Sequence, residues 1–208
     1  MNNDYRSAVP LIVLAVLAMC AGGCAKPVIR TCYTPGSNCM DAIVAEIGKA
    51  KTEVLVQAHA LTAKPVADAL VAARDAGANI SVILDRSYPF VQNSATYLAT
   101  IKSIPTFLDA RHEVAGSNVI VIDRSTVITG SMLFTPDAGE MNADNLLIIE
   151  SDSVAGSYIN NWSVHKAHAE EFVASSVLLK QEPVSAQPRS EKKKTGKKKG
   201  AVTKKKIP

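Results

Sequence analysis

Residues 111–135, RHEVAGSNVIVIDRSTVITGSMLFT, contain two short apolar runs with a polar turn between them. Residues 118–122 and 126–129 predict two strands, and Asp123-Arg124-Ser125 predicts the turn that joins them. The run VIVID is continuously apolar up to its aspartate, which is typical of a strand that helices cover on both faces. This stretch therefore predicts a buried strand pair inside a layered domain.

Helix and strand patterns alternate through the segment 28–180. Apolar residues at helical spacing predict helices over 40–49, 65–76, 91–103 and 153–173. Short apolar runs predict strands over 53–59, 79–85, 105–108 and 145–150. This alternation predicts the α/β class, with a layered mixed β-sheet flanked by helices on both faces, and about 150 residues suffice for one core.

The first 25 residues predict an export signal. Arg6 precedes an apolar run from Ala8 to Gly23, which suits a signal-peptide core and is short for a transmembrane helix. The small residues before Cys24 fit simple cleavage near Ala25 and also lipid attachment at Cys24, and a retained apolar anchor is a third alternative. We therefore expect an exported, periplasmic protein, either free or lipid-anchored to a bacterial membrane.

The remaining cysteines agree with export. Cys32 and Cys39 flank the segment YTPGSN, whose Pro35-Gly36 pair favours a turn. A turn that reverses the chain can bring two sulfurs together, and disulfides persist in oxidising compartments. We expect a Cys32–Cys39 disulfide, and the alternative is two unpaired small apolar side chains. Cys20 lies within the predicted signal.

Residues 182–208 form a low-complexity tail with nine lysines and Arg189 against Glu182 and Glu191, a net charge of +8. The whole chain carries +4, so residues 1–181 carry −4 and the basic character belongs to the tail. Such a segment has too few apolar residues to form a core, and we expect it to be disordered. It fits binding to nucleic acid or to an anionic membrane, and equally a solubilising extension without a specific partner.

The segment between signal and tail resembles the phospholipase D superfamily, and in particular its small exported bacterial endonucleases. The resemblance runs in order through CYTPGSNC at 32–39, residues 49–87, residues 94–114 and ITGSMLFTPDAGEMNADNLLIIE at 128–150. These relatives carry one His-x-Lys-x4-Asp motif per chain. In that family two motifs meet across a twofold axis, so the resemblance implies a homodimer with one shared active site.

The same resemblance implies the chemistry of intact members. One histidine attacks phosphorus and forms a phosphohistidine, the other protonates the leaving oxygen, and the lysines neutralise phosphate charge. In this chain the His position is Gly116 and the Lys position is Asn118, while the Asp is present as Asp123. The resemblance therefore implies a damaged catalytic centre, with Asp123 as a remnant that helps to orient an imidazole in relatives.

Further family positions around the expected pocket are partly kept. Ser131 matches the family's Gly-Ser pair, and we expect Ser131, Asn118 and Asn145 to be the phosphate-binding residues. Leu133 replaces a family Asn, and Asp144 replaces the Glu of an Asn-x-Glu-Asn element with a shorter carboxylate. These changes are consistent with drift away from catalysis.

The chain has four histidines, none of them at the motif. His112 precedes Gly116 by four residues, roughly 13 Å in an extended chain, so we expect it to cap the strand edge or face solvent. His59 stands where relatives often have Tyr, and we expect a partly buried polar residue there, with a substitute catalyst as the alternative. His165 and His168 have a spacing that can bind metal, but such pairs are weak evidence, and we expect surface helix residues, no metal and no cofactor.

Two functions follow from these expectations. The first is an exported phospholipase D-like protein with an impaired or inactive phosphodiesterase site. It binds phosphodiesters, nucleic acid or the cell envelope, and a related interpretation makes it part of an envelope or conjugation assembly. The alternative is an active endonuclease or phospholipase that uses a substitute histidine or an intact partner subunit. The paired loss at Gly116 and Asn118 favours the first.

Overall fold

The computed structural model describes residues 26–173, in which eight strands form one mixed sheet. The strands are β1 (Val28–Tyr33), β2 (Glu53–Ala58), β3 (Asn79–Asp85), β4 (Thr106–Asp109), β5 (Asn118–Ile122), β6 (Thr126–Gly130), β7 (Asn145–Glu150) and β8 (Glu170–Glu171). Their order across the sheet is β1-β7-β6-β5-β2-β3-β4-β8. Strands β2, β3 and β4 run parallel, and the remaining neighbours are antiparallel. The predicted α/β class and mixed sheet are confirmed.

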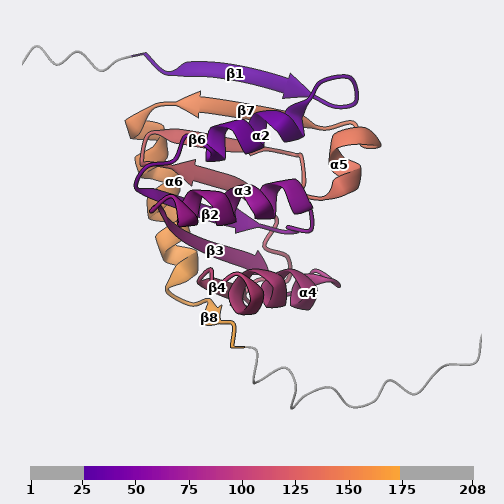
Figure 1. Cartoon of the computed structure of the whole chain (residues 1–208), viewed down its shortest axis with the longest axis vertical. Helices are drawn as coiled ribbons and strands as arrows, with labels where there is room; N and C mark the ends of the chain where they lie inside the picture. Colours follow the sequence, from indigo (N-terminus) through magenta and orange to yellow (C-terminus); the bar gives the residue numbers. More distant parts are fainter. Residues whose placement is uncertain (1–25, 174–208) are drawn as a thin grey trace, which may run out of the picture. The chain divides into compact units, whose positions relative to one another are not determined.

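Helices cover both faces of this sheet, as predicted. They are α2 (Cys39–Ile47), α3 (Lys64–Asp75), α4 (Val91–Ala95), a π-helical segment (Thr96–Ile101), α5 (Pro136–Glu140) and α6 (Asp152–Lys166). Figure 1 shows α2, α3 and α4 on the face toward the viewer and α6 behind the sheet. The predicted export signal (1–25) and lysine-rich tail (182–208) lie outside the described residues.

The packing of α6 shows how the central strands are held. Ala155 and Ile159 of this helix pack against Val119 and Val127 of the β5–β6 pair. Burial of an aliphatic side chain of this size contributes about 1.5–3 kcal/mol. Farther along the helix, the indole N–H of Trp162 donates to the backbone oxygen of Val56 at 3.0 Å, which joins α6 to the middle of β2.

Several boundaries differ from the predicted ones. The helix predicted over 153–173 ends at Lys166, because the N–H groups of His168 and Ala169 both donate to the carbonyl of His165 and close the last turn. The chain then pairs with β4 as the short strand β8. The helix predicted over 91–103 is divided into α4 and the π-helical segment. Strand β1 and helix α5 were not predicted.

The predicted disulfide is confirmed: Cys32 and Cys39 are bonded, with their Cα atoms 5.7 Å apart. It joins the end of β1 to the first residue of α2. Within residues 26–173, no helix is long and apolar enough to cross a membrane.

Candidate functional site

Several candidate residues lie together where the central strands of the sheet end, a region referred to as the sheet edge. The parallel strands β2 and β3 end at Ala58 and Asp85, and the antiparallel strand β5 begins opposite Ala58 at Asn118. The ends of β2 and β3 therefore lie beside the start of β5. His59, Asp85, Gly116 and Asn118 all belong to this edge.

Gly116 and Asn118 differ in their surroundings. Gly116 is exposed, and a Cβ atom built on it would meet only a methyl carbon of Val114, at 4.0 Å. Asn118 is 7% exposed, and its side-chain oxygen lies 3.4 Å from the backbone N–H of His59. The edge of the sheet thus has space at the position of the missing histidine, but neither position carries an imidazole or an ammonium group.

His59 makes a close polar contact at this edge. Its Nδ1 atom lies 2.7 Å from Oδ2 of Asp85, a carboxylate with no exposed side-chain surface. The same carboxylate accepts the N–H and hydroxyl of Ser87 and the N–H of Ala115. Burial alone would raise the pKa of Asp85, but these hydrogen bonds outweigh burial and hold the pKa below its usual range.

The Asp85 carboxylate therefore fixes both the imidazole of His59 and the segment that leads to Gly116. The expectation that His59 is a partly buried polar residue agrees with its side chain, which is 25% exposed. Asp85 was not predicted as a site residue. The signal that could have identified it is its place as the aspartate that ends the strand pattern NISVILD, at the same sheet edge as His59.

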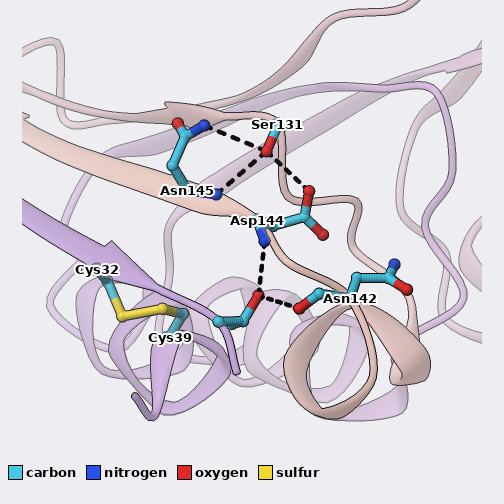
Figure 2. Close-up of a disulfide and its surroundings, with 7 residues drawn as sticks. Cys32, Cys39, Ser131, Asn142, Asp144 and Asn145 are labelled. Atoms are coloured by element: carbon cyan, nitrogen blue, oxygen red, sulfur yellow. Dashed lines mark hydrogen bonds between the residues drawn. A yellow bond between two sulfur atoms is a disulfide. The ribbon is translucent and has the colours of Figure 1, made fainter. Parts of the chain in front are cut away.

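Ser131 and Asn145 lie together, and the Ser131 hydroxyl and the Asn145 side-chain nitrogen are already bonded to protein groups. The Ser131 hydroxyl donates to Oδ1 of Asp144 at 2.7 Å and accepts from the N–H and side-chain amide of Asn145 at 3.1 and 3.3 Å, as Figure 2 shows. The N–H of Asp144 donates in turn to the hydroxyl of Thr34, two residues after the disulfide-bonded Cys32. A carboxylate in contact with Ser131 opposes phosphate binding there by charge repulsion.

Asp123 lies away from this group, and its expected role as a remnant of the catalytic centre is wrong. Asn118 is the first residue of β5 and Asp123 follows its last residue, so the two lie roughly 16 Å apart at about 3.3 Å per residue. The Asp123 carboxylate accepts the backbone N–H groups of Lys51, Thr52 and Glu53 and the hydroxyl of Thr52. Its role is therefore to anchor the start of β2.

These hydrogen bonds also fix the ionisation of Asp123. Burial alone would raise its pKa, but the donated N–H groups of Thr52, Glu53 and Lys51 outweigh burial and lower the pKa. Asp123 adopts a positive φ of 49°, a conformation that Asp and Asn tolerate better than most residues.

A hollow of about 600 Å³ is lined in part by Tyr88, whose ring makes an edge contact with the ring of His59 at 5.4 Å between centroids. It is lined by Thr62, Tyr88, Phe90, Asn93, Leu133, Thr135, Pro136, Asp137 and Asn142. No lysine or arginine is among these lining residues, and Asp137 adds a negative charge. A phosphodiester in this hollow would find aromatic and amide groups but no cation.

The remaining three histidines converge on one residue. The Nδ1 atoms of His112 and His165 and the Nε2 atom of His168 lie 3.1, 2.9 and 3.3 Å from Oδ2 of Asp109. Burial alone would raise the pKa of Asp109, but hydrogen bonds from His165, the Arg111 N–H, His112 and His168 lower it well below its usual range.

The interpretation of His165 and His168 as surface helix residues is therefore wrong. Their side chains are only 18% and 16% exposed and face the buried Asp109 carboxylate. His112 remains at the strand edge, as expected, and is 42% exposed. The rings of these three histidines are held at Asp109, on the strand next to the one that ends in Asp85.

Comparisons with known proteins agree with this architecture. The family described as cardiolipin synthase, PLD-like domain, matches residues 43–164. The phospholipase D of Rickettsia typhi is 34% identical over 139 residues, which cover 67% of this chain and 68% of that protein.

Solved structures give the same relationship. Nuc from Salmonella typhimurium, a phospholipase D family member, superposes with a TM-score of 0.68 and 25% identity over 72% of this chain and all of that chain. NucT from Helicobacter pylori shares the fold, with a TM-score of 0.64, 17% identity, and coverage of 71% of this chain and all of that one. The chain thus belongs to the phospholipase D superfamily.

Proposed function

We propose that this chain is an exported phospholipase D-like protein that no longer performs phosphohistidine catalysis and acts by binding polyanions. The observation that carries the proposal is the pair Gly116 and Asn118 at the sheet edge, where neither side chain can attack phosphorus or carry positive charge. A homodimer would not repair the loss, because both copies lack the same two groups. Loss of a covalent nucleophile typically lowers kcat on the order of 10⁶-fold.

The surroundings of Gly116 are poorly suited to phosphate, which supports polyanion binding by another part of the chain. Ser131 is bonded to the Asp144 carboxylate, and the neighbouring hollow is lined by no lysine or arginine. The lysine-rich segment 182–208, with a net charge of +8, supplies the attraction for phosphate backbones or anionic lipid headgroups instead. In this proposal the folded domain is the scaffold and the tail is the polyanion-binding element.

Export rests on two features of the chain. The apolar run before Cys24 fits a signal, and the Cys32–Cys39 disulfide fits an oxidising compartment such as the periplasm. Lipid attachment at Cys24 would hold the protein at a membrane. Incorporation of labelled fatty acid that disappears in Cys24→Ala is the expected result for a lipoprotein, and labelling that persists in this variant rules out Cys24 as the anchor.

Turnover assays test the catalytic half of the proposal. Purified full chain is incubated in EDTA with plasmid DNA and with bis(4-nitrophenyl) phosphate, next to an intact family member prepared in the same way. We expect rates at the level of the buffer blank for this chain and clear turnover for the relative. Turnover of this chain above the blank, retained through repeated purification, would overturn the proposal.

A second function is favoured by one observation, the 2.7 Å contact between His59 Nδ1 and the buried Asp85 carboxylate. A carboxylate at Nδ1 orients an imidazole and leaves Nε2 as the nitrogen that can take part in catalysis. Since Asp85 also binds the N–H of Ala115, this imidazole lies near the vacated position. The second candidate is therefore a phosphodiesterase in which His59 replaces the missing nucleophile.

Variants of this pair separate the two functions. If His59 is the nucleophile, His59→Gln abolishes turnover and Asp85→Asn reduces it strongly, because the imidazole loses its orienting partner. Asn161→Gln, at an exposed position of helix α6, serves as the control, since it leaves His59 and Asp85 in place. If no substrate is turned over by wild type, or if His59→Gln leaves turnover unchanged, the second function is excluded.

A further inference from the structure

The cluster of Asp109, His112, His165 and His168 is built from distant parts of the chain. Asp109 is the last residue of β4, and His112 lies in the turn that follows. His165 is in the last turn of α6, and His168 comes just after it. Three of the four histidines in the chain thus gather on one carboxylate whose side chain has no exposed surface.

The four side chains offer one ligand atom each, and these atoms all lie within 4.8 Å of one another. Tetrahedral ligands at about 2.0–2.1 Å from a zinc ion are about 3.3–3.4 Å apart. The three ring nitrogens lie 2.9, 3.1 and 3.3 Å from Oδ2 of Asp109, close to that spacing, and no pair of ligand atoms is more than 4.8 Å apart.

The four polar neighbours of Asp109 use the whole accepting capacity of its carboxylate. Oδ1 accepts the backbone N–H of Arg111 at 3.0 Å and lies 3.2 Å from Nδ1 of His112, and Oδ2 faces the ring nitrogens of all three histidines. A carboxylate has about four lone-pair sites, which these donors fill. A cation would instead take the nitrogen lone pairs together with a carboxylate oxygen.

We propose that Asp109, His112, His165 and His168 form a binding site for one divalent transition-metal ion, of which Zn²⁺ is the best match. Three imidazoles and one carboxylate suit zinc and related metals, whereas Ca²⁺ and Mg²⁺ prefer sites made of oxygen atoms. Four protein ligands make a closed set, which is typical of a structural site. The position at the C-terminal end of α6 also favours a cation, because the partial charge of the helix is negative there.

The ion fastens the end of α6 to the end of β4. This region is otherwise held by the two-residue pairing of β4 with β8, by a surface ion pair between Arg86 and Glu170, and by the ammonium group of Lys166 over the ring of Phe107. Asp109 is also the register partner of Asp85 in the neighbouring strand, so the metal site adjoins the edge that carries His59. Metal binding therefore secures the last helical turn and the edge strand β8.

Zinc binding by the full chain tests this site. The protein is stripped with EDTA, dialysed and titrated with Zn²⁺ in competition with a chromophoric chelator, and the bound metal is then counted per chain. We expect one zinc per chain, a higher midpoint of thermal unfolding with zinc, and visible absorption bands of tetrahedral type after substitution with Co²⁺.

Histidine variants provide matched controls. His112→Gln keeps the fold, because this side chain is the most exposed of the four, and His165→Gln removes a ligand from the helix. Substitution of residues that only hydrogen-bond to metal ligands typically weakens metal binding by about 10–100-fold. We therefore expect the loss of a ligand itself to weaken zinc binding by about 100-fold or more. His59→Gln removes the only histidine outside the cluster and should bind zinc like wild type.

The results of these experiments either support or overturn the proposed metal site. Loss of zinc, of the Co²⁺ bands and of the thermal shift in His112→Gln and His165→Gln, with all three kept in His59→Gln, supports the site. Equal zinc content in wild type and in both cluster variants would mean adventitious binding and would overturn it. The absence of any zinc-dependent shift in the wild-type unfolding midpoint would overturn it as well.

Discussion

At the scale of single residues, Gly116 is the position on which catalysis depends. A Cβ built there meets only Val114, at 4.0 Å, so a side chain can begin at this position without a clash. We predict that Gly116→His combined with Asn118→Lys restores measurable cleavage of bis(4-nitrophenyl) phosphate, although below the rate of an intact relative, because Leu133 and Asp144 still differ from the family pattern. Initial rates at several enzyme concentrations provide the measurement.

The matched control for this restoration is Gly116→Gln combined with Asn118→Lys. It adds similar volume and the same positive charge but no nucleophile, and it should remain at the blank. If the His variant folds, as judged by circular dichroism, and is no faster than the Gln variant, then residues other than these two that catalysis requires have also changed.

Asp123 is a second position where a single side chain has a large effect, in this case on the stability of the folded protein. Asp123→Asn keeps Oδ1 for Thr52 and Glu53 but places an amide N–H₂ against the N–H of Lys51, where Oδ2 now accepts at 2.8 Å. We predict a loss of about 1–3 kcal/mol in the free energy of unfolding at pH 7, measured by urea denaturation.

The pH dependence of this difference follows from the lowered pKa of Asp123. The folded carboxyl binds a proton less readily than the unfolded one, so its stabilisation is present above the ordinary pKa of 3.8 and is lost as the pH falls through the lower folded value. The gap between wild type and Asp123→Asn should therefore narrow in acid. A gap that stays constant from pH 7 to well below 3.8 would contradict this assignment.

At the scale of elements, the Cys32–Cys39 disulfide joins the edge strand β1 to helix α2. The cross-link closes a short loop, for which the chain-entropy estimate of stabilisation is about 2–3 kcal/mol. We predict that Cys32→Ser combined with Cys39→Ser lowers the free energy of unfolding by this amount in urea. Wild type treated with reductant should show the same loss, and equal stability with and without reductant would contradict it.

The elements that sequence patterns predicted well are those with strong periodicity. The predicted strand over 79–85 coincides with β3, and the helix over 65–76 differs from α3 by one residue at each end. Strand β1 was missed because it lies at the sheet edge and its residues are largely exposed, so its sequence lacks a buried alternation. The end of α6 was missed because pairing with β4, which is distant in sequence, competes with the helix.

The candidate sites also divide into features that the local sequence reveals and features that only the fold creates. The loss at Gly116 and Asn118 was visible in the sequence, because the motif is local. The meeting of His112 with His165 was not, because 53 positions separate them and only the fold brings them to Asp109. The role of Asp123 was misjudged for a related reason, since its partners Lys51 to Glu53 come from a different strand.

At the scale of the whole molecule, charge is divided between two parts of the sequence. Residues 1–181 carry −4 and residues 182–208 carry +8. We predict that removal of residues 182–208 weakens binding to double-stranded DNA and to anionic vesicles at low salt and reduces the slope of log K against log salt by several units, since each neutralised DNA phosphate contributes about 0.9. Fluorescence anisotropy and vesicle co-sedimentation across a salt series measure both effects.

The control for the tail keeps its length and changes its charge, with the nine lysines of 182–208 replaced by glutamine. Loss of binding in this variant assigns the effect to charge. Loss for DNA alone identifies nucleic acid as the partner, and loss for vesicles alone identifies the membrane surface. Unchanged affinity after truncation would rule out a polyanion-binding role for the tail.

Trapping of the covalent intermediate tests the catalytic account most directly. The unmodified full chain is mixed with a radiolabelled phosphodiester, quenched in alkali, where phosphohistidine survives, and digested for mass spectrometry. The account predicts no phosphorylated peptide from wild type and a labelled peptide containing residue 116 from the Gly116→His, Asn118→Lys variant. A phosphohistidine in the wild-type chain, at His59 or at any other histidine, would contradict it.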